Sequence, residues 1–469
     1  MKKLLLVPVL AAALLGLLAA PAFASPKTFT VSPNGGNDTV AIQAAFKAAV
    51  AAGPGSTVQL GPGHFYTNTI FVRNFRGYFR GAGEGKTVID TVGTLPVNTA
   101  IEPWPFLFGF QGGNVSVSDM SVSVSAATPG QSWNQWGNPY TAVGAIFLVT
   151  GSASSAFDRV GFAAGAGDSD GYDVQNDIVI TGSQVYGTAT DERGCPIALA
   201  PTGGTDSVSR CSFTGDYGIW VDGLTAGRLT VGGSAAQQNV FNEYLAGCFL
   251  TDNSNSDITV SHNQMACSSG GSIFLYQSYA TPFASPPPLP APRYLVSDNN
   301  ILATGEANGL WLEDDSEGWG YLPRLDATIA DNNIQLDNGG WDAGIDGFAV
   351  PGILVLHNHI WGTGLAGIDV GTDWYYPFDE PGSGWQIIGN DVSGVTATGA
   401  QWGVSTAQIW LGPDATLCLV VGCGPTTVLD QGTDDTLINV NRITDPPAAA
   451  AKPLNALKQM KQLRATALP

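Results

Sequence analysis

An asparagine-centred pattern recurs along the chain and limits what the chain can fold into. It reads SHNQM at 261–265, SDNNI at 297–301, ADNNI at 330–334, LHNHI at 356–360 and IGNDV at 388–392. A weaker copy, QQNVF at 237–241, precedes these, so the marker asparagines are spaced by 24, 36, 33, 26 and 32 residues. A fixed motif at variable spacing is typical of one supersecondary unit that repeats with insertions at its corners.

A second motif accompanies the markers and has the alternating apolar positions of a short strand. Two short strands per repeat cannot bury an apolar face alone, so we predict that the repeats stack as the coils of a solenoid. The marker asparagines then lie at a turn, where their amides can hydrogen-bond to one another along the stack. The copies of the second motif are Gly218-Ile219-Trp220-Val221, Gly247-Cys248-Phe249-Leu250, Ser272-Ile273-Phe274-Leu275, Gly309-Leu310-Trp311-Leu312, Gly344-Ile345-Asp346, Gly367-Ile368-Asp369-Val370 and Gln408-Ile409-Trp410-Leu411.

An amphipathic helix is predicted before the first repeat. Asn37 or Asp38 can cap its N-terminus, and Gly53 can end it. Its apolar stripe is formed by Ile42, Phe46 and Val50. We expect this helix to cover the open end of the first coil, because a terminal repeat needs a cap.

From this helix onward, the sequence resembles the opening of pectate-lyase-superfamily proteins. The stretches that carry the resemblance are DTVAIQAAFKAAVAAGPGSTVQLGPGHFYTNTIFV at 38–72 and RGAGEGKTVID at 80–90. The resemblance implies an all-β fold, a single-stranded right-handed parallel β-helix over residues 55–445, with the capping helix in residues 25–54. It implies carbohydrate chemistry by analogy only, since a fold does not fix a function.

The active-site motifs of polygalacturonases do not carry over to this chain as a set. Gly432-Thr433-Asp434-Asp435 and Arg442-Ile443-Thr444 occur without a Gly-His-Gly motif, and the arginine-bearing signature of calcium-dependent pectate lyases is not found. Candidate site residues must therefore come from the repeats themselves.

The first 24 residues have the features of a secretory signal peptide. Lys2 and Lys3 precede an apolar run, and Ala22-Phe23-Ala24 places small residues at a cleavage site before Ser25. We therefore expect a secreted or periplasmic protein with no transmembrane segment, because no other apolar run is long enough to span a bilayer. Cleavage changes the net charge from −20 to −22. Such a charge repels nucleic acid, and it disfavours polyanionic sugars unless a cation bridges them.

Six cysteines in an exported chain predict disulfide bonds, and we take pairs of sequence neighbours as the simplest connectivity. The cysteines are Cys195, Cys211, Cys248, Cys267, Cys418 and Cys423. The tail at 446–469 consists of a Pro/Ala linker and a short basic helix, and the alternatives for it are to cap the last coil, to lie on the surface or to remain mobile.

If the inward positions of the second motif are apolar, the residue between them faces outward. Because parallel strands in register lie about 4.8 Å apart, these residues form one external column. Exposed aromatic side chains on such a column are natural platforms for sugar rings, so a polysaccharide or oligosaccharide is the expected partner. We predict substrate-binding roles for Trp220, Phe249, Phe274, Trp311, Trp374, Tyr375 and Trp410.

Two carboxylates, Asp346 and Asp369, occupy successive coils of the same column, and Glu313 lies two residues past Trp311 on the same face. Like charges at this separation disfavour joint ionisation, so one member should act as a proton donor and the other as its ionised partner. We predict that these three residues are catalytic. The alternatives are a turn-stabilising role or a calcium site, since calcium favours several oxygen ligands; no other cofactor is indicated.

Three long insertions leave the same edge of the second strand, after Gln277, Glu313 and Val370. They either wall a groove along the outward face or fold over it and bury the aromatic column. The sequence therefore predicts an exported carbohydrate-active protein, with a glycoside hydrolase favoured. A polysaccharide lyase and a non-catalytic sugar-binding β-helix are the alternatives.

Overall fold

The computed structural model describes most of the chain between residues 25 and 443. The described ranges are 25–92, 106–123, 131–133, 139–141, 145–151, 154–163, 176–181, 183–184, 198–200, 204–214, 217–222, 227–244, 247–252, 256–277, 293–314, 325–337, 342–348, 350–371, 382–398 and 407–443. The predicted signal peptide and the tail at 446–469 lie outside them. No helix among these residues is long and apolar enough to cross a membrane.

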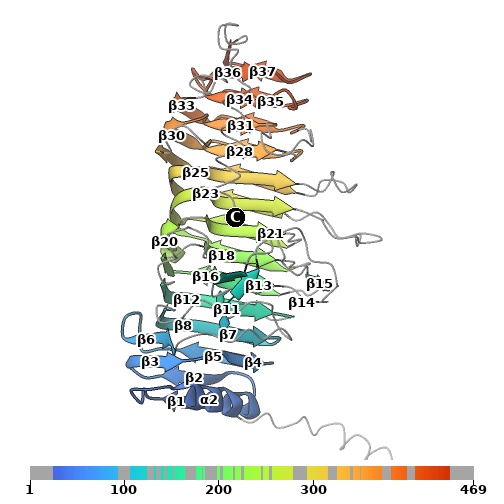
Figure 1. The fold of residues 1–469 in the computed structure, drawn as a ribbon. Helices are drawn as coiled ribbons and strands as arrows, with labels where there is room; N and C mark the ends of the chain where they lie inside the picture. The colour runs from blue at the N-terminus through green and yellow to red at the C-terminus, as the bar shows by residue number, and fades with distance from the viewer. Residues whose placement is uncertain are drawn as a thin grey trace, which may run out of the picture.

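The strands stack into an elongated solenoid, one coil above another (Figure 1). All register pairings within its 34-stranded network are parallel. Each complete coil contributes three strands to three long sheets, called sheets A, B and C here, whereas the sequence predicted two strands per coil. The missed strand is the short apolar stretch just before each asparagine, such as LVS at 295–297.

Sheet A starts at the N-terminal end, where β1 (Thr28–Val31) pairs with β2 (Ser56–Leu60). It continues through β5 (Arg76–Arg80), the first halves of β8 (Asn114–Ser123) and β12 (Ser154–Ala163), β16 (Thr205–Ser209), β19 (Arg228–Gly232), β22 (Asp257–Ser261), β24 (Arg293–Ser297), β26 (Asp326–Ala330), β29 (Leu354–Leu356), β32 (Gln386–Ile388), β35 (Leu419–Val421) and β37 (Thr436–Ile438).

Sheet B follows the corner after each strand of sheet A. It contains β3 (Gly63–Thr67), β6 (Thr87–Thr91), the second halves of β8 and β12, β17 (Ser212–Thr214), β20 (Val240–Tyr244), the first parts of β23 (Gln264–Gln277) and β25 (Asn300–Asp314), β27 (Asn333–Asp337), β30 (His359–Gly364) and β33 (Asp391–Ala397).

Sheet C completes each coil. It contains β4 (Ile70–Arg73), β7 (Phe106–Gln111), β11 (Ala145–Thr150), β13 (Asn176–Thr181), β18 (Tyr217–Asp222), β21 (Gly247–Asp252), the second parts of β23 and β25, β28 (Ile345–Phe348), β31 (Ile368–Val370), β34 (Ile409–Leu411), β36 (Thr427–Asp430) and β38 (Asn441–Ile443). Two antiparallel pairs stand apart from the three sheets, β9 (Gln131–Trp133) with β10 (Pro139–Thr141) and β14 (Ser183–Gln184) with β15 (Ala198–Ala200).

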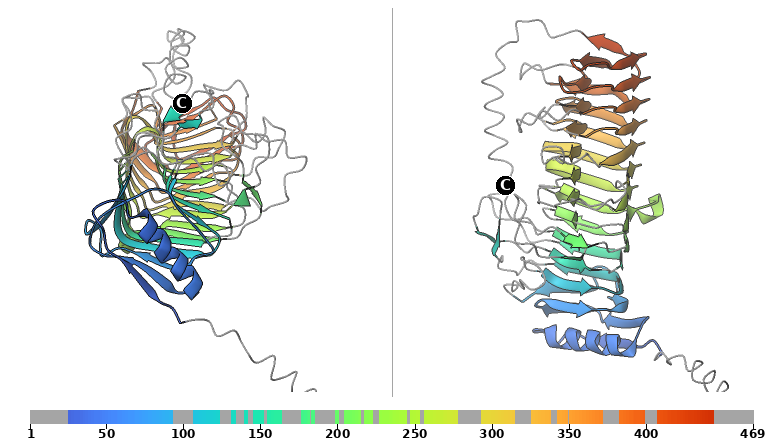
Figure 2. Two further views of the ribbon diagram at one scale, coloured as in Figure 1. Left: turned by 60° about the horizontal axis from the view of Figure 1, so that its bottom comes forward. Right: turned by 90° about the vertical axis from the view of Figure 1, so that its right-hand side faces the viewer.

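The helix α2 (Thr39–Ala52) lies across the N-terminal end of the solenoid (Figure 2). The N-cap residue Asp38 makes no side-chain cap hydrogen bond, whereas Asn37 Oδ1 accepts the Thr39 backbone N–H at 2.9 Å. Phe46 is fully buried and packs its ring against Phe75 and Phe79. Val50, which was predicted to lie in the apolar stripe, is exposed, and Ala49 takes its place in the core.

The solenoid interior is a continuous apolar core. Below the asparagine repeats it contains a stack of rings, in which Phe213 lies parallel to Phe162 at 4.8 Å and to Phe241 at 4.4 Å between centroids. Aliphatic side chains continue the same column in later coils, for example Met265 and Ile301. Each coil therefore buries its apolar face only against its neighbours, which is the energetic basis of a solenoid.

The marker asparagines form the predicted ladder at the corner between sheets A and B. Each side-chain amide donates to the Oδ1 of the next, over 2.9 Å from Asn239 to Asn263 and 3.0 Å from Asn263 to Asn299. The same pattern runs on through Asn332 and Asn358 to Asn390. Each amide also donates to a backbone carbonyl of the preceding coil, as Asn299 does to Val260. The ladder is buried and fully bonded, as a buried polar column must be.

The residue before most ladder positions adopts a left-handed backbone conformation. His262, Asp298, Asp331 and His357 have φ between 51° and 59°, and Gly389 has 65°. This conformation turns the chain sharply from sheet A into sheet B. Asp, Asn, His and Gly tolerate it best, which explains why one of them precedes each of these five markers.

Cysteines occupy both ends of the ladder. Cys211 and Cys423 are in register with Asn239 and Asn390, and the Cys211 backbone N–H donates to Asn239 Oδ1 at 2.9 Å. Burial raises the pKa of the Cys211 thiol to about 12. Two of the six cysteines are thus explained as small buried side chains at a crowded corner.

The predicted pairing of neighbouring cysteines is incompatible with one part of this arrangement. Cys418 and Cys423 flank β35 at its two ends, and a strand of that length holds their Cα atoms roughly 10 Å or more apart, beyond the reach of a disulfide bond. In contrast, the Cys248 thiol contacts the thiol of Cys267 inside the solenoid. None of the five cysteines in the described ranges forms a disulfide bond in this structure, and Cys195 lies outside them.

Candidate functional site

The second motif forms one outward column along sheet C, as its alternation predicts. The register pairs Phe274 with Trp311, Trp311 with Asp346, Asp346 with Asp369, and Asp369 with Trp410. Toward the N-terminus the column continues through Leu250 to Trp220. The aromatic residues therefore lie in the coils on both sides of the two acids.

Phe249 does not belong to this column, and its predicted role as a sugar platform is wrong. It pairs in register with Ile219 and Ile273, faces the interior and is fully buried. The prediction aligned Gly247 with Gly218, but the structure pairs Gly247 with Tyr217. The run Cys248-Phe249-Leu250 is apolar throughout, so its sequence alone cannot assign a face.

The aromatic side chains of the column differ in exposure. Phe274 and Trp311 are partly exposed and stack with their ring centroids 4.7 Å apart. Trp410 is only 3% exposed, and its Nε1–H donates to Gln431 Oε1 at 2.9 Å. The Phe274–Trp311 pair is therefore the accessible part of the predicted platform. Trp410 belongs to the same column but is buried.

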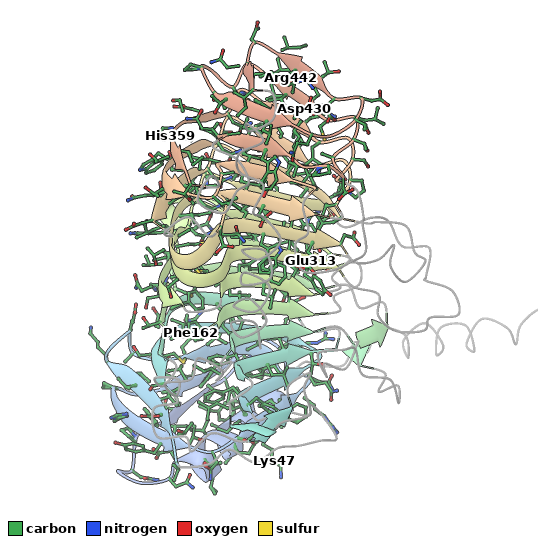
Figure 3. All side chains as sticks on the ribbon, turned by 45° about the horizontal axis from the view of Figure 1, so that its top comes forward. Lys47, Phe162, Glu313, His359, Asp430 and Arg442 are labelled. Atoms are coloured by element: carbon green, nitrogen blue, oxygen red, sulfur yellow. The ribbon has the colours of Figure 1, made fainter. Side chains whose placement is uncertain are left out.

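The acids of the column are buried although they point away from the solenoid core. Asp346 is 7% exposed and Asp369 is 2% exposed. Glu313, 2% exposed, lies one coil below Asp346 and two residues further along the strand, in register with Tyr276 and Phe348. Each of the three carboxylates has interaction partners in the structure. Figure 3 shows Glu313 midway along the solenoid axis, between Phe162 and the Asp430–Arg442 pair.

A glycine lies two residues before each of the two aspartates, at the corner where the chain enters sheet C. A Cβ on Gly344 would lie 2.6 Å from the Ile360 side chain and 2.6 Å from the Gly367 backbone oxygen. Sheets B and C approach so closely at this corner that only glycine fits before the strand begins. The Gly-Ile-Asp sequence therefore first fixes the corner, then fills the core with isoleucine, and finally turns the carboxylate outward.

Two further acids border the column. Asp314 is fully buried, and its Oδ2 accepts the Leu325 backbone N–H at 3.1 Å. Asp342 is 5% exposed, and its backbone oxygen accepts the Leu365 N–H at 2.9 Å. Sequence alternation places neither residue on the column, so their burial could not be anticipated from the repeats.

Several predicted features fall outside the described residues. Trp374 and Tyr375 lie in one of the three insertions, and the side chain of Trp220 is also outside the description. The insertions do depart from one edge of sheet C, because β23, β25 and β31 end at neighbouring register positions. No three His, Cys, Asp or Glu residues of the described ranges are placed to hold a metal ion, so calcium binding remains a prediction.

A separate acid pair lies at the C-terminal end of the solenoid, where Figure 3 labels Asp430 and Arg442. Asp430 Oδ2 is 2.9 Å from an Arg442 guanidinium nitrogen, and Asp435 Oδ1 accepts the Cys418 backbone N–H at 2.6 Å. Burial, reinforced by the neighbouring Asp430 carboxylate, raises the pKa of Asp435 to about 6. These residues come from the last three strands and their turn, far along the axis from the middle of sheet C.

Comparisons with known proteins find similarity at the level of fold. No protein-family model and no curated protein sequence matches this chain. Among solved structures, the A-module of the Azotobacter vinelandii mannuronan C-5 epimerase AlgE4 aligns with a TM-score of 0.46 and 12% identity, covering 90% of this chain and 98% of that one. The family 28 exopolygalacturonase of Yersinia enterocolitica aligns with 0.39 and 10%, covering 90% and 79%.

A third solved structure, DFA-IIIase from Arthrobacter chlorophenolicus A6 in complex with GF2, aligns with a TM-score of 0.38 and 14% identity, covering 85% of this chain and 94% of that one. At such identities the similarity concerns architecture alone. With its three parallel sheets and its capping helix, the chain is a right-handed parallel β-helix, the fold that its repeats and opening motif predicted.

Proposed function

We propose that the outer face of sheet C binds a polysaccharide and that Asp346 and Asp369, assisted by Glu313, cleave a glycosidic bond there. The observation that carries this proposal is the in-register acid pair, which lies in one outward column with the stacked rings of Phe274 and Trp311. The solved structures above include a polysaccharide epimerase and a polygalacturonase by name. They make carbohydrate chemistry a natural first hypothesis without identifying the reaction.

The strand spacing gives two backbone separations between acids, and both are close to the carboxyl separations of glycoside hydrolases. Asp346 and Asp369 lie on adjacent strands, about 4.8 Å apart in a parallel sheet, close to the ~5–5.5 Å of a double-displacement pair. Glu313 and Asp346 are one coil and two residues apart, roughly 8 Å along the diagonal, within the ~6.5–9.5 Å typical of inverting enzymes. The stereochemistry of the product would distinguish the two pairs.

The chemistry required of these residues follows from their environment. The proposed chemistry requires that one of the two carboxylates keep its proton, which repulsion between two nearby like charges favours. That acid protonates the glycosidic oxygen of the leaving sugar, and the ionised partner attacks the anomeric carbon or activates a water molecule. Lys or Arg as the base would suit a lyase, and the described strands of sheet C from β7 to β36 contain neither.

The test is an activity screen followed by isosteric variants. The mature protein is incubated with neutral, amine-bearing and acidic polysaccharides, and new reducing ends and unsaturated products are measured. Asp346→Asn and Asp369→Asn should each lower the rate on the best substrate by at least about a hundredfold. Asp337→Asn, an exposed acid on the outer face of sheet B, is the matched control and should retain full activity.

The alternatives give different results in the same experiment. If both variants keep near-native rates, the acids are structural and the catalytic assignment must be abandoned. If the variants lose melting temperature or calcium binding together with activity, a calcium or turn-stabilising role is favoured. A protein that binds a glycan without releasing any product would be a non-catalytic β-helix.

A further inference from the structure

The outer face of sheet A changes its character along the axis of the solenoid. In the middle coils, its outward side chains carry hydroxyl groups, as do Ser207 and Ser209 on β16, Thr230 on β19 and Thr259 on β22. Near the C-terminal end, where Figure 1 labels β35 and β37, six of the eight outward side chains on β29, β32, β35 and β37 are aliphatic. These six form what we call the apolar strip, which consists of Leu354, Leu356, Ile388, Leu419, Val421 and Ile438.

The apolar strip is continuous from one coil to the next. Leu356, Ile388, Val421 and Ile438 occupy one register column, in which successive strands lie about 4.8 Å apart. Ile438 is 44% exposed, and the other three are partly exposed. Single exposed aliphatic side chains are ordinary on a protein surface, but a contiguous row of them is typical of a surface that another segment covers.

The path of the chain leads its C-terminal tail toward this face. In each coil, a strand of sheet C is followed by the sheet A strand of the next coil, as β37 follows β36. The last described strand, β38, belongs to sheet C and lies in the same coil as Ile438. The same path would therefore bring the chain after residue 443 to sheet A. Residues 444–453 can span up to about 33 Å, which is ample for crossing one corner.

The sequence of the tail matches the apolar strip in length and in character. Leu454, Leu457, Met460 and Leu463 recur at every third position, as on one side of a short helix. In a helix, the distance from Leu454 to Leu463 is about 14 Å. The strands from β37 to β29 also extend over about 14 Å along the axis.

Charge favours the tail over a second copy of the chain. The tail contains four lysine or arginine residues between positions 452 and 464 and no acid, whereas the mature chain carries a net charge of −22. Two copies of such a chain repel one another. Exposed Asp298 and Asp331 lie at the corner beside the N-terminal end of the apolar strip, in the two coils before Leu356. A tail that runs from β37 toward β29 brings its last cation, Arg464, to this acidic end.

We propose that residues 446–469 fold back along the outer face of sheet A and cover the apolar strip. The proposal concerns a different face from the sugar site on sheet C and does not depend on it. The tail is then an intramolecular cover, which keeps the aliphatic row of one molecule from associating with that of another.

The experiment places the photoreactive residue p-benzoylphenylalanine at Ile388, in the apolar strip, or at Thr230, the matched control on the same face. The mature protein is irradiated at low concentration, and crosslinked peptides from the monomer band are identified by mass spectrometry. Position 388 should crosslink to residues 446–469 at least about tenfold more than position 230 does. A second probe at Leu419 should give the same result, which guards against a local effect of the first probe on folding.

Two double variants of the tail sharpen the test. Leu457→Ser with Met460→Ser should lower the crosslink yield at position 388 by about tenfold, because two apolar contacts are lost. Gln459→Ser with Gln462→Ser, on the other side of the predicted helix, is the matched control and should leave the yield unchanged.

Three results would overturn the proposal. Crosslinks between two molecules would make a second copy the occupant of the apolar strip. Equal yields at positions 388 and 230 would mean that the tail contacts sheet A without preference. Absence of any crosslink from positions 388 and 419 to the tail would mean that the tail lies elsewhere, for example over the last coil.

Discussion

The asparagine ladder and the outer column of sheet C are both built from one residue per coil, yet they differ in every other respect. In the ladder, the same side chain recurs in six coils, and each amide bonds to its neighbours at 2.9–3.0 Å. In the outer column, the residue changes from Trp to Leu, Phe, Trp, Asp, Asp and Trp along the axis.

This difference separates two kinds of constraint. A position that must bond to its own copy in the next coil has to repeat the same residue, because a buried amide without its partner is costly. A position that faces outward is free of that demand, so its variation reflects what it contacts there. In a solenoid, repetition therefore marks structure, and local departures from it mark candidate chemistry.

The largest effect is expected from breaking the ladder. Asn299→Ala removes the acceptor of the Asn263 backbone N–H and the donor to the Val260 carbonyl, both buried. We expect the free energy of unfolding to fall by about 3–5 kcal/mol, measured by denaturant titration. Asn333→Ala, exposed on the adjacent strand, should change it by less than about 0.5 kcal/mol. Equal effects for the two variants would remove the distinction between ladder and surface.

The next largest effect is expected from Asp206, a buried acid. Unlike the ladder amides, its side chain has one polar atom without a hydrogen bond. Asp206 Oδ1 accepts the Ser155 N–H and hydroxyl at 2.7 Å each, while the buried Oδ2 has no hydrogen-bond partner. Burial raises the pKa of Asp206 from 3.8 to about 6. The folded state therefore binds the proton more tightly than the unfolded state does, and its stability decreases as the pH rises from about 4 to about 6.

This decrease should amount to roughly 3 kcal/mol, given about 1.4 kcal/mol for each pKa unit. In Asp206→Asn, most of this decrease should be absent when the free energy of unfolding is measured across the same pH range. A smaller slope of the same sign should remain, because the pKa of Asp435 is also raised. An unchanged pH dependence in the variant would show that Asp206 is not its source.

A third prediction concerns the two thiols that meet inside the solenoid. In protein exported through the predicted signal peptide, Cys248 and Cys267 should form a disulfide bond as they lose two protons and two electrons to a thiol–disulfide oxidant. The bond should contribute about 2–3 kcal/mol. Alkylation followed by mass spectrometry should find this pair protected until reduction, whereas Cys418 and Cys423 should be alkylated on unfolding without reductant. Protection of Cys418 together with Cys423 would contradict the structure.

The smallest effect tests the outer column. Trp311→Ala removes one face of the stacked pair with Phe274 and should weaken oligosaccharide binding by about tenfold. Trp361→Ala provides the comparison, because Trp361 stacks on His359 at 4.7 Å on the outer face of sheet B. Calorimetry on both variants should show weaker oligosaccharide binding for Trp311→Ala only. A similar loss of binding in both variants would indicate that exposed aromatic rings bind the oligosaccharide nonspecifically.

The sequence predicts the ladder well because the ladder is repetitive. Six copies of one polar residue, five of them after a residue that tolerates a left-handed turn, require a common explanation, and stacked amides supply it. The outward column is also predictable where apolar and polar residues alternate, as around Asp369. The alignment fails at Phe249, where three apolar residues in succession leave the choice of face to the neighbouring coils.

Burial of the outward acids could not be predicted in the same way. Alternation places Asp346 and Asp369 outside the core, yet both side chains are buried, and the repeat pattern does not indicate what an outward side chain contacts. The same holds for the pairing of cysteines. Cys248 and Cys267 meet because two sheets converge at a corner, and Cys418 and Cys423 are held apart by a strand that the two-strand interpretation did not contain.

The amide ladder also gives the molecule a direction and a unit of length. In all five bonds between ladder amides, the nitrogen donates toward the C-terminal end, so the dipoles of successive side chains are aligned and polarise one another. Each coil presents the same donor above and the same acceptor below. A coil such as the 33 residues from Asn299 to Asn332 is therefore interchangeable with its neighbours at this corner, and gene duplication of one coil would lengthen the solenoid without leaving an unsatisfied amide.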